Sequence, residues 1–230
     1  MTHLHYFPIS AGLVAVFAVL LVGLVILIEI GLLRRAYAAL GLNPFVVMLL
    51  LFGSLLGSYV NIPLVRLPEQ RVVSREVVEI MGVPFLAPVA VDWPGTVLAI
   101  NVGGGVIPIM LSIYLLVRYR LWGPGLVAIA IIAFFVHQMA TPVPGVGIAV
   151  PTVAPPLLAA FAGLVLSRRY AAPLAYIGGS LGVLIGADLL NLGDLRSLGA
   201  PVASIGGAGT FDGIFLTGVI AVLLASLVTG

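Results

Sequence analysis

Residues 171–192 read AAPLAYIGGSLGVLIGADLLNL, and this stretch decides the class of fold. Asp188 is its only charged residue, and most of the others are apolar or small. A helix needs about 20 mostly apolar residues to cross the hydrocarbon core of a bilayer. The stretch therefore predicts a transmembrane helix that carries one carboxylate.

The rest of the chain has the same apolar character. Of its 230 residues, 62% are hydrophobic and 8% are charged, whereas soluble domains carry about 25% charged residues. A soluble domain of this composition would lack the polar side chains that cover a surface in water. The sequence therefore predicts an all-α integral membrane protein, with the lipid bilayer as its first partner and residues 1–230 as one polytopic domain.

About seven transmembrane helices are expected, some of them broken and rich in glycine. The predicted spans are residues 10–33, 44–61, 95–117, 121–139, 150–166 and 171–192, with a last one within 202–228. The N-terminal residues lack the basic region of a signal peptide, so we expect the first span to be retained.

The placement of the arginines predicts the orientation of the spans. The short loops after the first, third and fifth spans hold Arg34, Arg35, Arg118, Arg120, Arg168 and Arg169. The opposite side holds Arg66, Arg71, Arg75 and Arg196, spread over longer loops. Because short cytoplasmic loops are enriched in arginine and lysine, we expect the N-terminus outside and the C-terminus in the cytoplasm. The expected location is the cell (inner) membrane.

Residues 63–94 form the only sizeable segment outside the predicted spans. Residues 71–80 mix β-branched and charged side chains, Gly82-Val83-Pro84 is typical of a turn, and residues 85–91 favour a second strand. We expect a small extracytoplasmic β-hairpin. Two roles stay open for it: a lid over the helices, or an edge that pairs with an extended peptide.

Several kinds of chemistry are not expected. The chain has no cysteine, which excludes disulfides, thiolate metal sites and cysteine nucleophiles. Its ten basic residues are all arginines, scattered or paired rather than clustered, so a nucleic-acid surface is not expected. His137 has no second histidine or group of carboxylates at the spacing of metal ligands. We expect no metal and no cofactor.

Asp188 is the first candidate functional residue, because a charged group at membrane depth is costly and usually functional. Gly178, Gly182 and Gly186 recur at every fourth position, a pattern that lets another helix approach closely. Asp188 lies about 200° around the helix from Gly186, and Asn191 shares the face of the aspartate. We therefore expect this helix to be central, with a partner helix at the glycines and a polar site at Asp188.

Asp212, in the last span, is the second candidate. Its glycine neighbours are Gly206, Gly207, Gly209 and Gly213. Glycines weaken a helix, and unwound backbone at membrane depth is tolerated only inside protein or beside water. Adjacent antiparallel helices would bring Asp188 and Asp212 to a similar depth. Two carboxylates that share a proton can act as acid and base on a water molecule, which is the chemistry of an aspartyl protease.

Two resemblances follow from these segments. GADLLNL at residues 186–192 and GGAGTFDGIF at residues 206–215 resemble an uncharacterised prokaryotic multi-pass membrane family, known only as a domain of unknown function. That resemblance extends over most of the chain and implies no activity. At longer range, the two segments resemble the presenilin and signal peptide peptidase-type (GxGD) intramembrane aspartyl proteases. Those enzymes carry one aspartate in the sixth span and one in the seventh, and Asp188 and Asp212 match that order.

The longer-range resemblance implies hydrolysis of a transmembrane peptide substrate with Asp188 and Asp212 as the catalytic pair. Ala187 stands where those proteases have a tyrosine, and Phe211 stands where they have a glycine. The residues that we expect to support the pair are Gly186, Asn191, Gly206, Gly207, Gly209, Gly213, Asn101 and Gly104.

Two alternative functions stay open. INVGGGVIP at residues 100–108 predicts a broken helix, which is common at the binding sites of transporters. It faintly resembles SIGGAG at residues 204–209, and the two should run in the same direction. In a transporter or channel, the same aspartates would carry protons or bind a cation beside Asn101 and Gly104. In a non-catalytic scaffold, the aspartates would only hydrogen-bond the broken backbone.

Overall fold

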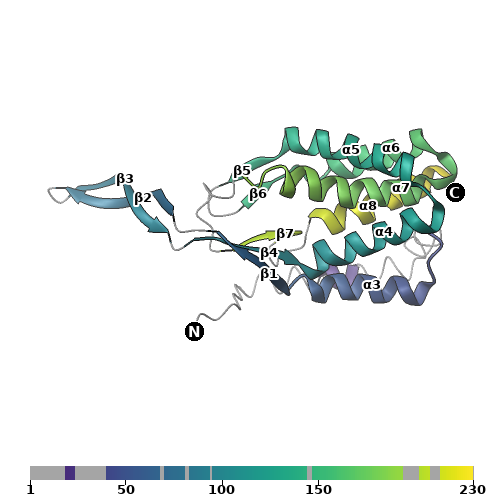
Figure 1. Ribbon diagram of the computed structural model, residues 1–230, viewed down its shortest axis with the longest axis horizontal. Helices are drawn as coiled ribbons and strands as arrows, with labels where there is room; N and C mark the ends of the chain where they lie inside the picture. The colour runs from purple at the N-terminus through teal and green to yellow at the C-terminus, as the bar shows by residue number, and fades with distance from the viewer. Residues whose placement is uncertain are drawn as a thin grey trace.

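The computed structural model describes residues 19–23, 40–67, 70–80, 83–93, 95–143, 147–193, 202–207 and 213–229. A bundle of helices carries small β-sheets at one end (Figure 1). The helices are α3 (Pro44–Gly57), α4 (Ile107–Tyr119), α5 (Trp122–Met139), α6 (Ala154–Leu166), α7 (Ala171–Ile177) and α8 (Gly213–Thr229). Single π-helical turns, Val102–Val106, Gly178–Gly182 and Leu184–Leu189, precede α4 or follow α7.

Three helices in the described part of the chain are long and apolar enough to cross a bilayer. They are Val102–Tyr119, Trp122–Met139 and Arg168–Leu189. Shorter apolar helices cover Phe45–Gly57, Ala154–Leu166 and Leu216–Thr229. Of the first predicted span, only residues 19–23 are described, and they are helical. The chain therefore has the helices of a membrane protein, while the number seven stays a prediction.

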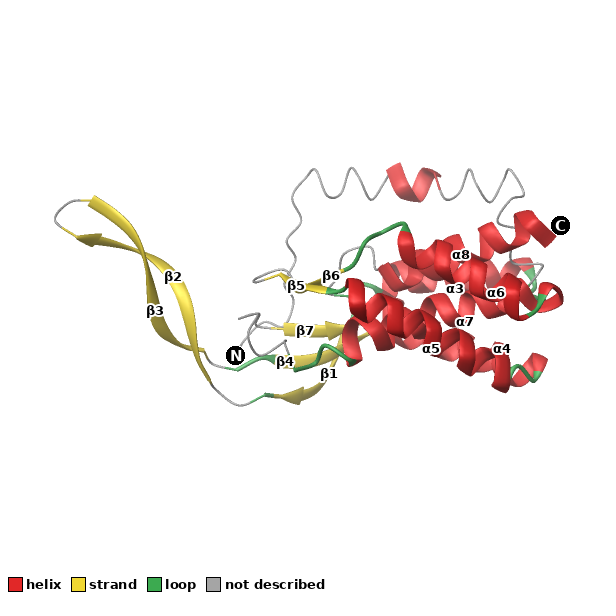
Figure 2. Cartoon of the chain, turned by 90° about the horizontal axis from the view of Figure 1, so that it is seen from above, coloured by secondary structure: helices red, strands yellow, loops and turns green. Residues whose placement is uncertain are grey.

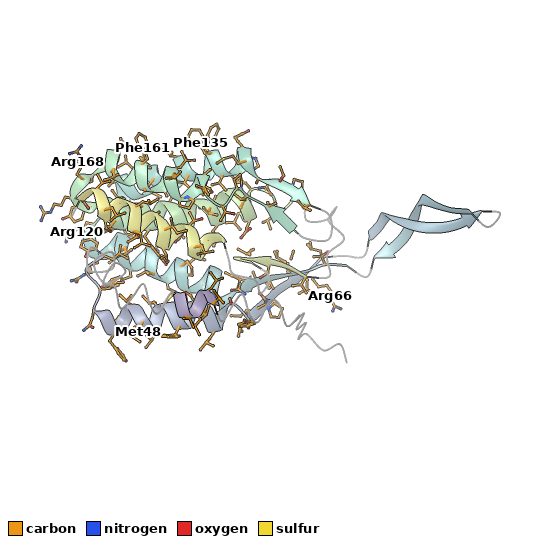
Figure 3. All side chains as sticks on the ribbon, turned by 180° about the vertical axis from the view of Figure 1, so that it is seen from behind. Met48, Arg66, Arg120, Phe135, Phe161 and Arg168 are labelled. Atoms are coloured by element: carbon orange, nitrogen blue, oxygen red, sulfur yellow. The ribbon has the colours of Figure 1, made fainter. Side chains whose placement is uncertain are left out.

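The bundle surface is apolar, as lipid contact requires. Met48 on α3, Phe135 on α5 and Phe161 on α6 point outward in Figure 3, and the exposed fraction of Phe161 is 67%. Arg120 and Arg168 lie together at the end of the bundle far from the sheets (Figure 3). The side chains thus divide into an apolar belt and a basic end.

The helix Arg168–Leu189 is the centre of the bundle, as predicted. In its apolar 18-residue window, 83% of the residues are buried, compared with 28% in Trp122–Met139. Gly182 and Gly186 let α5 approach: an added Cβ would lie 2.6 Å from Ile132 Cβ at Gly182 and 2.5 Å from Ala133 O at Gly186. The prediction that these glycines form a helix-packing surface is confirmed.

Gly186→Ala tests this packing. The new methyl group would collide with the backbone of Ala133, and overpacking of this kind costs about 1–3 kcal/mol of folding free energy. We expect a lower midpoint of thermal unfolding in detergent. Gly193→Ala is the matched control, because a Cβ added there meets nothing within 4 Å. Equal melting of the two variants would contradict the close packing.

A three-stranded sheet at the end of the bundle corrects the all-α prediction. It consists of β1 (Asn61–Arg66), β4 (Val97–Asn101) and β7 (Val202–Ile205), in the order β1-β4-β7. Strand β4 is antiparallel to β1 and parallel to β7. The predictions that the second span reaches residue 61 as helix and that the third begins at residue 95 are wrong. A short apolar run fits a strand and a buried helix equally well, and here pairing with distant segments decides.

The predicted pairing of two strands in a β-hairpin is confirmed, while its extracytoplasmic location stays a prediction. Strands β2 (Gln70–Ile80) and β3 (Val83–Trp93) pair antiparallel along their whole length. The hairpin projects beyond the sheet, away from the helices (Figure 2). A third, two-stranded sheet joins β5 (Thr141–Val143) to β6 (Gly147–Ala149). The sheet β1-β4-β7 therefore stands between the helices and the hairpin.

Candidate functional site

Asp188 lies in the π-helical turn Leu184–Leu189, at the end of the central helix that faces the sheet. Its Oδ2 accepts a hydrogen bond of 2.7 Å from the backbone N–H of Gly206. The side chain is partly buried. Single π-helical turns occur frequently at functional sites. The carboxylate predicted from sequence is therefore held by the turn that follows β7.

Gly206 owes its position to the absence of a side chain. Its φ is +85°, a region that suits glycine. An added Cβ would lie 2.5 Å from the nitrogen of Gly105 and 2.7 Å from the carbonyl carbon of Gly104. The backbone after β7 therefore rests directly on the π-helical turn Val102–Val106. Asp188, Gly206 and Gly104, which sequence reasoning selected separately, belong to one site.

Asn101 joins this turn to neighbouring segments. Its Oδ1 accepts a 2.9 Å hydrogen bond from the N–H of Gly104. Its Nδ2 donates to the carbonyl oxygen of Ser58 at 2.7 Å and to Oδ1 of Asn61 at 3.0 Å. Only 1% of its surface is exposed. A buried amide with these partners meets the requirement that buried polar groups be hydrogen-bonded.

Asn61 and Ser204 complete this network, and sequence reasoning missed both. Ser204 Oγ donates to Asn61 Oδ1 at 2.6 Å, which links β7 to β1 across β4. Asn61 lies opposite Asn101 in the register of the sheet. Neither residue carries a sequence signal, because a single asparagine or serine in a short strand looks ordinary until the strands are paired.

Gly186 and Asn191 have structural roles. Asn191 Nδ2 donates to the carbonyl oxygens of Gly186 and Ala187, each at 2.9 Å. These bonds satisfy carbonyl groups that a helix leaves without partners at its C-terminus. Gly186 packs against α5, away from Gly206. Asn191 therefore closes the helix that carries Asp188, without a hydrogen bond to the carboxylate.

The segment that carries the second aspartate of the predicted pair is only partly described. Asp212 and Gly209 lie outside the described residues. Gly213 is the first residue of α8, and Gly207 donates a 3.2 Å hydrogen bond to Ser204 O. The distance between the two carboxylates therefore stays a prediction.

The predicted neighbours, the sixth and seventh spans, do pack together. A Cβ added at Gly179 would lie 3.4 Å from the Cα of Gly218, and one added at Gly218 would lie 2.5 Å from Ser180 Oγ. Small residues on both helices allow this approach. The helix of Asp188 and the helix that follows Asp212 are thus in direct contact.

The described residues contain no candidate metal site. No group of three or more histidine, aspartate or glutamate side chains is close enough there to hold an ion. The nitrogen Nδ1 of His137 is buried without a hydrogen-bond partner among those residues. The donor that binds the Asp188 carboxylate is the backbone N–H of Gly206, while the Asn101 amide and the Ser204 hydroxyl donate to groups within the network.

Comparison with protein families finds one match, described as "Protein of unknown function (DUF1614)", over residues 55–224. No curated protein and no solved structure matches the chain. The matched residues include the last three residues of α3, α4 to α7 and most of α8, together with Asp188, Asp212 and the Asn101 network. The chain belongs to this family, DUF1614.

Proposed function

We propose that the protein is an intramembrane aspartyl protease-like enzyme, with Asp188 and Asp212 as its catalytic pair. The observation that carries the proposal is the Asp188 carboxylate, held through one oxygen by Gly206 N–H beside a sheet. Within the described residues, the other oxygen, Oδ1, has no hydrogen-bond partner. In the proposal, this oxygen binds a water molecule or shares a proton with the Asp212 carboxyl group.

The proposed chemistry needs one ionised and one protonated aspartate. The ionised carboxylate removes a proton from water, whose oxygen attacks the peptide carbonyl carbon. The protonated carboxyl group gives its proton toward the departing amine nitrogen as the C–N bond breaks. The products are a new carboxyl group and a new amine. Two neighbouring carboxylates favour this division, because both cannot easily ionise together.

The sheet beside Asp188 supports a polypeptide substrate. An extended peptide can add to the edge of a sheet through main-chain hydrogen bonds. Among the described strands, β7 pairs only with β4 and β1 pairs only with β4, so both are outer strands. Strand β7 leads directly to Gly206. An extended segment beside β7 would reach the Asp188 carboxylate with its backbone already aligned.

The proposal includes seven spans, an N-terminus outside and an extracytoplasmic hairpin, in one polytopic domain of the cell (inner) membrane. The basic end that contains Arg120 and Arg168 lies opposite the sheet (Figure 3), as expected of a cytoplasmic end. Asp188 would then lie near the outer surface. The order of the aspartates agrees with the presenilin and signal peptide peptidase-type enzymes.

Cleavage of a transmembrane peptide in proteoliposomes tests the function. Purified protein is reconstituted with labelled single-span peptides that carry extended segments on either side, in water enriched in oxygen-18. We expect two fragments, with the heavy oxygen in the new carboxyl group. Intact peptides across a panel of varied sequences would contradict the proposal.

Transport is the second candidate, favoured by the break between β4 and α4. There the chain passes from strand to a π-helical turn with three consecutive buried glycines, Gly103, Gly104 and Gly105. Irregular backbone at membrane depth is typical of transporter sites. Flux of protons or monovalent cations into the same proteoliposomes, lost in Asp188→Asn, would favour transport over hydrolysis.

A further inference from the structure

Asn101 reaches Gly206 by two separate routes. In the first, it caps the π-helical turn whose Gly104 and Gly105 backbone supports Gly206. In the second, its Nδ2 bonds Asn61, which also accepts the hydroxyl of Ser204, two residues before Gly206. The first route ends on the backbone of Gly206 itself, and the second ends two residues before it, at Ser204.

We propose that Asn101 is a positioning residue for Asp188. It fixes the backbone of Gly206, and the N–H of Gly206 in turn fixes one oxygen of the carboxylate. The geometric part of this inference stands on the described contacts alone. Its consequence for catalysis rests on the proposed function.

The position requires an amide. Oδ1 accepts from Gly104 N–H, while Nδ2 donates to two acceptors, Ser58 O and Asn61 Oδ1. Aspartate would keep the first bond but would present a second oxygen to these acceptors. Alanine would remove all three bonds and take this partner away from two buried groups, Gly104 N–H and Ser58 O, which is costly. Asparagine supplies an acceptor oxygen and, on a separate nitrogen, the two N–H donors that these three bonds use.

Hydrogen exchange measured by mass spectrometry on the purified full chain tests the geometry. In Asn101→Ala, we expect the Gly206 amide to exchange about tenfold faster, the factor that loss of one hydrogen bond produces. Exchange in α5 should not change. Ser204→Ala, which removes one hydroxyl at the partly exposed end of the second route, is the milder variant and should give a smaller increase at the same amide.

Asn43→Ala is the matched control. Asn43 also caps a helix: its Oδ1 accepts a 2.9 Å hydrogen bond from Phe45 N–H at the start of α3. It is exposed and makes no described contact with Gly206. Its replacement should leave Gly206 exchange and peptide cleavage at wild-type values.

Cleavage kinetics supply the second readout. A displaced carboxylate lowers the rate of the chemical step more than it weakens peptide binding. We expect kcat to fall about tenfold or more in Asn101→Ala, with KM within about twofold of wild type. A structural role alone would lower the amount of folded enzyme and leave kcat per active molecule unchanged.

The outcomes separate the two proposals. Unchanged exchange at Gly206 in both Asn101→Ala and Ser204→Ala would overturn the positioning role, as would an equal increase throughout α5. If the wild-type protein cleaves no peptide but Gly206 exchange rises as expected, positioning stands and the proposed function fails. Should Asn101→Ala not fold, Ser204→Ala decides by the same exchange measurement.

Discussion

Asp188→Asn is expected to abolish peptide hydrolysis and to preserve the fold. Asparagine has the shape of aspartate, and its Oδ1 can still accept the hydrogen bond from Gly206 N–H. It cannot take a proton from water or share one with Asp212. We expect cleavage in proteoliposomes to fall by about 10³-fold or more, because acid–base groups contribute about 10²–10⁴-fold.

The same loss is expected for Asp212→Asn, and the double variant should be no worse than either single one. Residues that act as one catalytic unit give effects that do not add. Asp92→Asn, on β3 of the hairpin, is the control that removes a carboxylate far along the chain from the pair. Wild-type cleavage by either single variant would remove that aspartate from the mechanism. Unfolding temperatures within a few degrees of wild type would show that the fold is retained.

Apolar composition and glycine spacing were sufficient to predict the bundle. The prediction for residues 121–139 matches α5, and the glycines at 178, 182 and 186 do face that helix. Both features are local, because the length of a helix and the small residues of its packing surface can be read from the sequence of that helix alone. The sheet β1-β4-β7 could not be found in this way, because its strands come from three distant parts of the chain.

The site was predicted in pieces and not as a whole. Residues 100–105 and 204–209 share a similar pattern, and the structure pairs Ile100 with Ile205 on parallel strands. This bears out the expectation that the two segments run in the same direction. Sequence selected Asp188, Gly206, Asn101 and Gly104 separately. Strand pairing brings these residues together, because it places the turn Val102–Val106 in contact with the turn at Gly206. Pairing between distant strands cannot be predicted from the sequence of either segment alone.

Gly206→Ala is the substitution with the largest expected effect on folding. Alanine at a φ of +85° is strained, by about 1–2 kcal/mol. The new methyl carbon would lie 2.5 Å from the nitrogen of Gly105, so that β7 and the turn Val102–Val106 would have to separate. Separation would also weaken the hydrogen bond to Asp188. Together we expect a loss of about 3–6 kcal/mol of folding free energy.

Thermal unfolding of the purified protein measures this loss, with Gly123→Ala as control. Gly123 lies in the first turn of α5, and a Cβ added there meets nothing within 4 Å. A Gly206→Ala protein as stable as this control would mean that Gly206 is not in contact with the turn Val102–Val106. The contact between the backbone of Gly206 and the backbone of Gly104 and Gly105 is therefore expected to support both the fold and the proposed catalytic site.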